Sequence, residues 1–189
     1  VSPSPNGEIF LTDLVRLAVQ QGMLVQTVST EKEGEAIGIN SRIQLSAAER
    51  VLRQRVRESW LLKGVTMPDP ETVYIDMDVV LSNDIVLHPN THISGASTIG
   101  SDSQIGPNSR IVESVIGSGC RIVESLVENS TLENRVAIGP YSRVRSSSKL
   151  YDDVYIGTHT EIKNSVFGNA SKSSHFSYIG DADIGSNVN

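Results

Sequence analysis

The sequence has very little cysteine, no long apolar run and no excess of positive charge, and each shortage excludes a class of protein. Its single cysteine, Cys120, allows neither an internal disulfide nor a cysteine-based metal site. No segment approaches about 18 consecutive apolar residues, and the first residues do not resemble a signal peptide. The net charge is −6. We therefore expect a cytoplasmic protein with small-molecule or protein partners, no nucleic acid partner and no membrane association.

Aromatic residues are also few, at 5% of the chain, whereas aliphatic residues recur at every sixth position. The positions are Ile75, Leu81, Leu87, Ile93, Ile99, Ile105 and Ile111, and then Leu132, Ile138, Val144, Leu150, Ile156 and Ile162. A small or β-branched residue often lies four positions after the aliphatic one, and glycine often follows it directly. This is the hexapeptide repeat of a parallel β-helix, whose narrow interior has little room for rings.

Three such repeats close one coil of about 18 residues, so residues 75–189 predict roughly six stacked coils. The spacing falls to five at Ile111–Ile116, Ile162–Phe167 and Ile179–Ile184, which we interpret as tightened turns. The alternative is a sandwich of ordinary strands. It would need period-two alternation and regular turn signals, and the sequence has neither. At the small-residue position four after Ile116, Cys120 is expected to point inward.

The first third of the chain predicts different elements. Residues 12–21 predict a short helix capped by Thr12 or Asp13 and ended by Gly22, followed by a buried strand at Leu24–Val28 and a loop at Glu31–Glu35. A helix followed by a strand is typical of an α/β domain, and we assign residues 1–43 to the end of one.

A long linker helix is predicted at 44–66, opened by a capping box at Ser46–Glu49 and closed by Gly64. Its apolar residues recur at three and four: Leu45, Ala48, Leu52, Val56 and Trp60. The opposite face carries Arg50, Arg53, Arg57 and Glu58. These arginines could indicate nucleic acid binding, but the acidic balance favours a solvated face. Pro68 and Pro70 end the helix before the β-helix, which we assign to 70–189.

Arg145 and Lys163 are the first candidates for chemistry, because they lie one full coil apart with no slip between them. Both follow an inward aliphatic residue, so they should stack on adjacent coils about 4.8 Å apart. Two cations at that spacing repel unless an anion lies between them, and a guanidinium with an ammonium suits a phosphate. The alternative is a pair of splayed, hydrated side chains.

His175 is the candidate general base, since imidazole titrates near neutral pH. A lone histidine on a polar rung can also be a simple surface residue. The register places residue 180 at the corner occupied by Lys163, so we expect the cations, His175 and Tyr178 to share one edge. A zinc site would need three converging imidazoles. His88 and His92 lie at least three coils from His159 and His175, which disfavours a metal.

Several segments closely resemble the GlmU family of bifunctional N-acetylglucosamine-1-phosphate uridyltransferases and glucosamine-1-phosphate acetyltransferases. They are Asn6–Glu8, Leu11–Asp13, Gly38–Leu45, the arginine-rich helix, Gly139–Arg145 and His175–Asn189. The resemblance covers essentially the whole chain. It implies a mainly β fold, with a left-handed parallel β-helix that trimerises, preceded by a linker helix and the tail of an α/β nucleotidyltransferase domain.

The resemblance also implies roles for individual residues. By it, His175 is the acetyl-transfer base, Arg145 and Lys163 contact the sugar phosphate, and Tyr178 and Asn189 contact the sugar. Asn40 matches an asparagine that shares a divalent metal, Mg²⁺, and the nucleotide sugar. The substrates implied are acetyl-CoA with glucosamine 1-phosphate, and UTP with N-acetylglucosamine 1-phosphate. The product, UDP-N-acetylglucosamine, would supply cell-envelope polymers such as peptidoglycan and lipopolysaccharide.

The sequence departs from the family in ways that bear on activity. The family's glycine-rich nucleotide-binding start and metal-binding aspartate would precede residue 1, and its acetyl-CoA-binding coils would follow residue 189. Ser146 and Ser147 replace the usual Pro-Gly after Arg145, which could loosen the phosphate corner. We therefore expect a fragment that alone catalyses neither step. Two alternatives stay open: a sugar-1-phosphate nucleotidyltransferase whose β-helix only oligomerises, and a non-catalytic trimeric β-helix scaffold.

Overall fold

A computed structural model describes residue 7 and residues 10–30 and 34–189, and divides the chain into two units, 1–44 and 45–189. In the first unit, α1 spans Asp13–Gln20, as the sequence predicts. Thr12 is its N-cap residue but makes no side-chain cap hydrogen bond. Gly22 follows the helix with a φ of +73°.

The strand predicted at Leu24–Val28 is wrong. These residues form no regular element, and the side chains of Leu24 and Val28 are exposed. A strand needs a hydrogen-bonded neighbour, and the described residues of this unit supply none. The tail of an α/β domain is therefore not visible. Of the loop predicted at Glu31–Glu35, residues 31–33 lie outside the described ranges, and 34–36 form a turn.

The long helix α2 spans Arg42–Leu61, so it starts before the predicted capping box. Ser41 provides the cap instead: its Oγ accepts the Gln44 N–H at 3.2 Å, and Gln44 Oε1 accepts the Asn40 N–H at 2.7 Å. The helix stops short of Gly64, which ends the following turn with a φ of +91°.

Only the C-terminal half of α2 packs as the apolar pattern predicts. Val56 and Trp60 contact the core of the β-helix, whereas Leu45 and Leu52 are exposed. The solvated face predicted for the arginines is wrong at Arg57, which is 5% exposed. A short 3-10 helix, η1 (Pro70–Thr72), then leads into the first coil.

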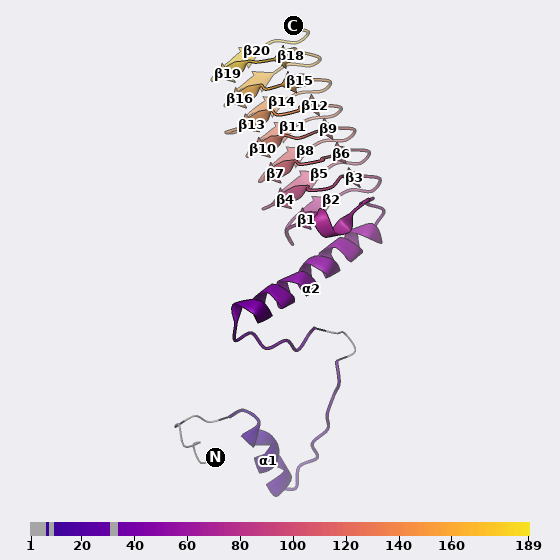
Figure 1. Ribbon diagram of the computed structural model, residues 1–189, viewed down its shortest axis with the longest axis vertical. Coiled ribbons are helices and arrows are strands. Elements are labelled where there is room, and N and C mark those ends of the chain that lie inside the picture. The colour runs from indigo at the N-terminus through magenta and orange to yellow at the C-terminus, as the bar shows by residue number, and fades with distance from the viewer. Residues whose placement is uncertain (1–6, 8–9, 31–33) are drawn as a thin grey trace. The chain divides into compact units, whose positions relative to one another are not determined.

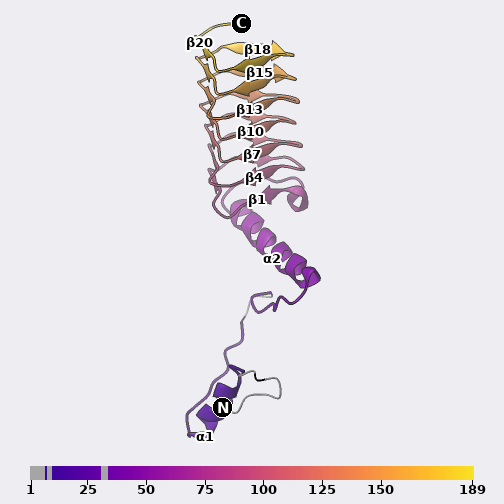
Figure 2. The same cartoon turned by 90° about the vertical axis from the view of Figure 1, so that its left-hand side faces the viewer.

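The predicted parallel β-helix is confirmed, and it is built from three sheets whose strands stack coil upon coil (Figure 1, Figure 2). The first sheet, here sheet B, runs β1 (Tyr74–Ile75), β4 (His92–Ser94), β7 (Arg110–Val112), β10 (Leu126–Glu128), β13 (Arg143–Arg145), β16 (Glu161–Lys163) and β19 (Tyr178–Gly180). Sheet C runs β2 (Val80–Leu81), β5 (Thr98–Ile99), β8 (Val115–Ile116), β11 (Thr131–Leu132), β14 (Lys149–Leu150), β17 (Val166–Phe167) and β20 (Asp183–Ile184). Sheet A runs β3 (Val86–Leu87), β6 (Gln104–Ile105), β9 (Arg121–Ile122), β12 (Ala137–Ile138), β15 (Tyr155–Thr158) and β18 (Lys172–His175).

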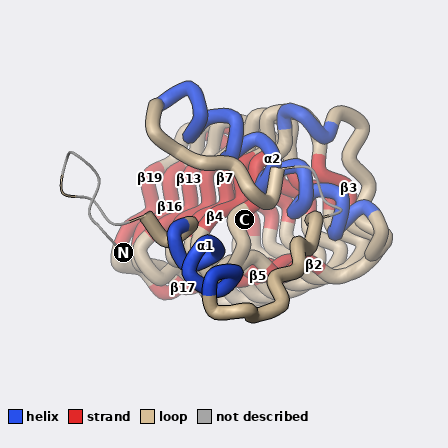
Figure 3. The backbone as a smooth tube through the Cα atoms, turned by 90° about the horizontal axis from the view of Figure 1, so that it is seen from below, coloured by secondary structure: helices blue, strands red, loops and turns tan. Residues whose placement is uncertain are grey.

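The stack holds seven strands in each of two sheets, so it has about seven coils rather than the six predicted. A coil is shorter than three full repeats wherever the spacing slips. Ile111 pairs with Val127 rather than with Asn129, and Val127 pairs with Val144 rather than with Arg145. Viewed along the stack, strands of one sheet lie one behind another (Figure 3).

The core is one continuous column of aliphatic side chains, in which Ile105, Ile111 and Ile156 are completely buried. The small residues beside it have a second purpose, because their hydroxyls join one coil to the next. Ser125 Oγ donates to the Val123 carbonyl at 2.7 Å and accepts the Ser142 N–H at 3.1 Å. Such bonds satisfy buried backbone groups at the corners, where the sheets leave them unpaired.

Cys120 occupies one of these positions, as predicted. Its Sγ donates to the Glu133 carbonyl at 3.0 Å, and its N–H donates to Ser103 Oγ at 3.1 Å. Burial raises the pKa of the thiol to about 11, so it stays protonated at neutral pH.

Candidate functional site

Arg145 and Lys163 lie where the spacing predicts, paired in register on the adjacent strands β13 and β16. Gly180 on β19 follows them in the same column. The three residues occupy the ends of the sheet B strands, next to the turns that lead into sheet C.

Each cation is neutralised by a carboxylate of the chain. Arg145 Nε donates to Glu161 Oε1 at 2.6 Å, and this hydrogen bond raises the pKa of Arg145. Lys163 Nζ lies 3.6 Å from Asp181 Oδ2. A hydrogen bond from Asn164, and then the charge of Lys163, lower the pKa of Asp181. The repulsion anticipated between the cations is thus offset internally, although a guanidinium has five N–H donors and keeps several for a ligand.

Tyr178 reaches across the face of sheet B. It begins β19 and stands above Glu161 in register. A Cβ on Gly180 would lie 2.7 Å from Tyr178 Oη, so the phenol rests against the glycine that follows the Arg145–Lys163 pair. Glycine at 180 therefore lets the hydroxyl approach the cations, a role that sequence reasoning missed.

His175 does not share an edge with the cations, so that prediction is wrong. It ends β18 in sheet A, paired with Thr158, and the corner residues Phe176 and Ser177 separate it from sheet B. Its ring is exposed and lies edge-on to Phe176, with centroids 6.0 Å apart. The cations and the imidazole thus flank opposite ends of the sheet B strands, because the corner turns the chain between them.

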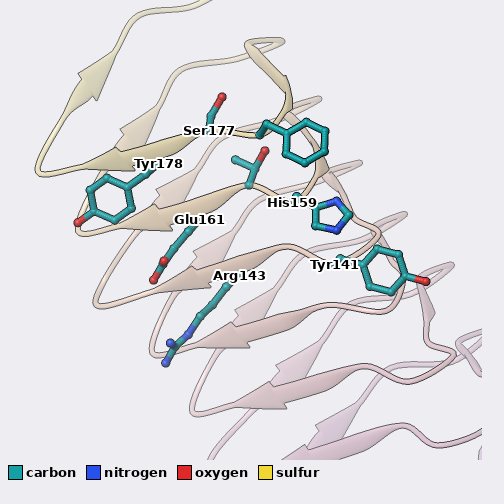
Figure 4. A pocket seen from close by; sticks show the side chains of 8 residues that line it. Tyr141, Arg143, His159, Glu161, Ser177 and Tyr178 are labelled. Atoms are coloured by element: carbon teal, nitrogen blue, oxygen red, sulfur yellow. The ribbon is translucent and has the colours of Figure 1, made fainter.

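A surface hollow of about 460 Å³ lies between these two edges (Figure 4). Its lining consists of Tyr141, Arg143, His159, Thr160, Glu161, Phe176, Ser177 and Tyr178. Arg143, Glu161 and Tyr178 project on one side of it, and Tyr141 and His159 on the other. His175 directly precedes the lining residue Phe176.

The second side of the hollow is a ladder of rings that sequence reasoning missed. Tyr141 and His159 have ring centroids 5.2 Å apart, and His159 stacks on Phe176 at 5.1 Å with an interplanar angle of 9°. All three residues have positive φ at the corner between sheets A and B. Each follows the one before it by a single coil, so the register could have revealed them. His159 Nδ1 also lies 2.7 Å from Thr158 Oγ1.

The lining of the hollow includes neither of the two predicted asparagines, Asn40 and Asn189. Asn40 is exposed in the first unit, where its N–H donates to Gln44. Asn189 is also exposed. It belongs to the coil that follows β18, because the Lys172 N–H of β18 donates to the carbonyl of the neighbouring Val188. Mg²⁺ takes about six oxygen ligands. Asn40 offers one amide oxygen, and the described residues hold no cluster of three His, Cys, Asp or Glu, so they do not fit a metal by themselves.

Neither α1 nor α2, the helices in the described ranges, has the length and apolarity that would let it cross a membrane.

Comparisons with known proteins agree with the parallel β-helix and indicate which family the chain resembles. The family described as "GlmU-like, C-terminal hexapeptide" matches residues 96–183. Two proteins named "Bifunctional protein GlmU" are similar over 183 residues, or 97% of the chain. The one from Halalkalibacterium halodurans is 40% identical and the one from Caldanaerobacter subterraneus subsp. tengcongensis is 46% identical. The chain spans 40% of the length of each.

Among solved structures, a histidine-to-asparagine mutant of perosamine N-acetyltransferase from Caulobacter crescentus, in complex with CoA and GDP-perosamine, matches with a TM-score of 0.53. The match covers 87% of this chain and 69% of that one at 15% identity. At that identity the likeness concerns the fold alone.

Proposed function

The chain belongs to the GlmU family, and from this premise we propose that it supplies part of an acetyltransferase site for UDP-N-acetylglucosamine synthesis. The acetyl group of acetyl-CoA is transferred to the amine of glucosamine 1-phosphate. The whole protein then transfers uridylyl from UTP to N-acetylglucosamine 1-phosphate. Because the chain spans 40% of its relatives' length, both activities, a homotrimeric assembly and a cytoplasmic location are proposals for the whole protein.

The observation that carries the proposal is the register of Arg145 and Lys163, with the Tyr178 hydroxyl beside them at Gly180. Together they form a compact group of cationic and hydroxyl donors on one face. A sugar phosphate needs such a combination, because its phosphate is a dianion and its ring carries hydroxyls. By the family resemblance Asn189 adds a further sugar contact.

His175 acts as the general base in this proposal. The amine nitrogen of glucosamine 1-phosphate attacks the thioester carbonyl, the C–S bond breaks, and CoA leaves as its thiol. The imidazole removes the proton that the amine loses as it forms the amide and passes it to the departing sulfur. The ring is exposed, and His175 directly precedes Phe176 of the hollow's lining, so substrate can reach it. No oxyanion donor is assigned within this chain.

The ion pairs favour one rival. Because Glu161 and Asp181 already neutralise Arg145 and Lys163, the same face could belong to a β-helix that binds nothing there and serves as a scaffold. A nucleotidyltransferase whose β-helix only oligomerises would look the same. In the GlmU proposal the phosphate takes over the donors that the two carboxylates hold in the free protein.

Thiol release from acetyl-CoA in the presence of glucosamine 1-phosphate tests the proposal. The assay is run on the chain itself and on the chain joined to the remaining length of a GlmU relative. His175→Ala should lower the turnover of the longer protein by about 10² to 10⁴-fold. His88→Ala, at the other end of the stack, should leave it unchanged.

Arg145→Ala should instead raise the KM for glucosamine 1-phosphate, because it removes phosphate binding. Turnover unaffected by His175→Ala would refute the assigned base. No thiol release from a folded longer protein would favour the two rivals.

For uridylyl transfer, we propose that Asn40 contributes one ligand to a Mg²⁺ site whose other ligands this chain does not supply. No step of that reaction is assigned to the residues described.

A further inference from the structure

At the end of the stack away from His175, α2 leads into the first coil (Figure 1). Residues of the helix and of this coil line a small polar pocket. Its volume is about 250 Å³. Its lining, here called the arginine pocket, consists of Ser46, Arg50, Arg53, Arg57, Glu71 and Tyr74. The proposed acetyltransferase makes no use of these residues.

The three arginines share one face of α2 because they are spaced three and four positions apart. Sequence reasoning assigned this face to solvent, yet it lines a pocket. The side chain of Arg57 is 6% exposed, and its Nη2 donates to Glu71 Oε1 at 2.8 Å. Burying a guanidinium is costly unless it is paired, so Arg57 needs an anion at this place.

The Arg53 guanidinium is held in position by an aromatic ring. Its Cζ lies 4.8 Å from the centroid of Tyr74, and Glu49 pairs with it on the helix. The Tyr74 ring also stacks on His92, with centroids 4.4 Å apart and an interplanar angle of 8°. This arrangement fixes the planar fork before any ligand arrives, which lowers the entropy cost of binding.

The charges of the lining do not balance. Three guanidinium groups line the pocket. Glu71 pairs with Arg57 and Glu49 pairs with Arg53, which leaves an excess of one positive charge, that of Arg50, in a chain whose net charge is −6. The side chain of Arg50 has no hydrogen bond or ion pair with another residue of the described ranges. Glu71 is 75% exposed, so its side chain can turn away from Arg57 and be replaced by another anion.

We propose that the arginine pocket binds the phosphate or diphosphate group of a small soluble molecule. A phosphate carries close to two negative charges and three or more acceptor oxygens, which match the guanidinium forks of Arg50 and, once Glu71 has turned away, of Arg57. A volume of about 250 Å³ lies just below the usual range for drug-sized ligands, so the group that enters is small. The net negative charge of the chain disfavours docking on an anionic membrane.

Calorimetric titration of the folded chain with pyrophosphate, at constant ionic strength, tests the proposal. Arg50→Gln should weaken binding by about tenfold or more, because it removes charge-assisted hydrogen bonds. Arg121→Gln, which removes the same charge from an exposed position on β9, should change the affinity less than twofold. Glu71→Gln should strengthen binding, since it removes the resident carboxylate.

The fluorescence of Trp60 gives a second readout. It is the single tryptophan of the chain, follows Arg57 by about one helical turn on α2 and packs against the core. Its emission should shift on pyrophosphate addition in the wild-type protein, and Arg50→Gln should need about tenfold or more pyrophosphate for the same shift.

Three results would overturn the proposal. They are no binding of pyrophosphate at millimolar concentration, equal weakening by Arg50→Gln and Arg121→Gln, and weaker binding in Glu71→Gln. Co-sedimentation with phosphatidylglycerol vesicles that depends on Arg50, without pyrophosphate binding, would also overturn it in favour of a lipid headgroup.

Discussion

The substitution Gly157→Ala tests whether close packing between coils holds β18, the strand that carries His175, in place. The glycine lies in β15, directly against β18. A Cβ at this position would lie 1.9 Å from the Ser174 carbonyl oxygen, whereas ordinary van der Waals contact begins at 3.4 Å. The backbone must take up the difference between these two distances, because a backbone oxygen cannot rotate away. Gly157→Ala therefore requires β15 and β18 to separate locally by that difference.

The cost follows from comparable overpacking. Forcing an extra methyl group into a packed interior typically costs about 1–3 kcal/mol. At about 1.4 kcal/mol per factor of ten, local opening of the last coils should become about 5- to 140-fold more frequent. Because His175 directly follows Ser174, the same displacement should lower acetyl transfer by about 100-fold if His175 is the base.

Hydrogen exchange of the β15 and β18 amides is the appropriate assay, because a stack of repeats opens locally rather than as a single unit. Gly185→Ala is the matched control: the nearest atom to its Cβ would be Val188 Cγ2 at 4.0 Å, so exchange should not change. Equal exchange rates in Gly157→Ala and Gly185→Ala would show that the close approach at Gly157 does not exist and would refute the reasoning.

Three further outcomes follow from single positions. Ile105→Ala, at a fully buried site, should lower the free energy of unfolding by about 2–5 kcal/mol, whereas the adjacent exposed Gln104→Ala should change it by less than about 0.5 kcal/mol; equal urea midpoints would contradict the core assignment. A hydrogen bond from the Asn134 N–H, at 2.8 Å, lowers the pKa of Asp152 below its unfolded value, so the resulting stabilisation is present above about pH 4 and is lost as the pH falls further. Asp152→Asn should therefore make the urea midpoint fall less steeply between pH 5 and 3. Parallel curves of urea midpoint against pH for the two proteins would refute this. With a pKa of about 11, Cys120 should resist a thiol reagent at pH 8 until urea opens its coil, and fast labelling of the folded protein would show that the thiol is accessible.

The parallel β-helix could be predicted from the sequence, because each repeat dictates its own local structure. Aliphatic residues at every sixth position can all be buried only if they line one narrow column. The register between coils then follows from the number of residues in each coil. That is why the pairing of Arg145 with Lys163 agrees with the spacing. The predicted number of coils was too low because it assumed about 18 residues in every coil. Coils with shortened turns, such as the one from Ile111 to Val127, use fewer residues.

Predictions failed where a residue depends on contacts that no repeat encodes. Leu24–Val28 has the composition of a strand, but no neighbouring strand exists in the described part of its unit. The start of α2 was misplaced because two serines can open a capping box, and the hydrogen bonds of Ser41 decide between them. Arg57 looked solvated because helix periodicity cannot reveal that the first coil covers that face.

The sequence by itself determined the architecture, the inward position of Cys120 and the column that joins Arg145, Lys163 and Gly180, since all of these depend only on position within a periodic repeat. The tertiary structure alone decided the rest. It placed His175 on a different sheet from the cations, gave those cations carboxylate partners, and gathered the helix arginines around a pocket. The physical reason is that corners and helix packing set the direction of a side chain in space, and direction is not a property of spacing.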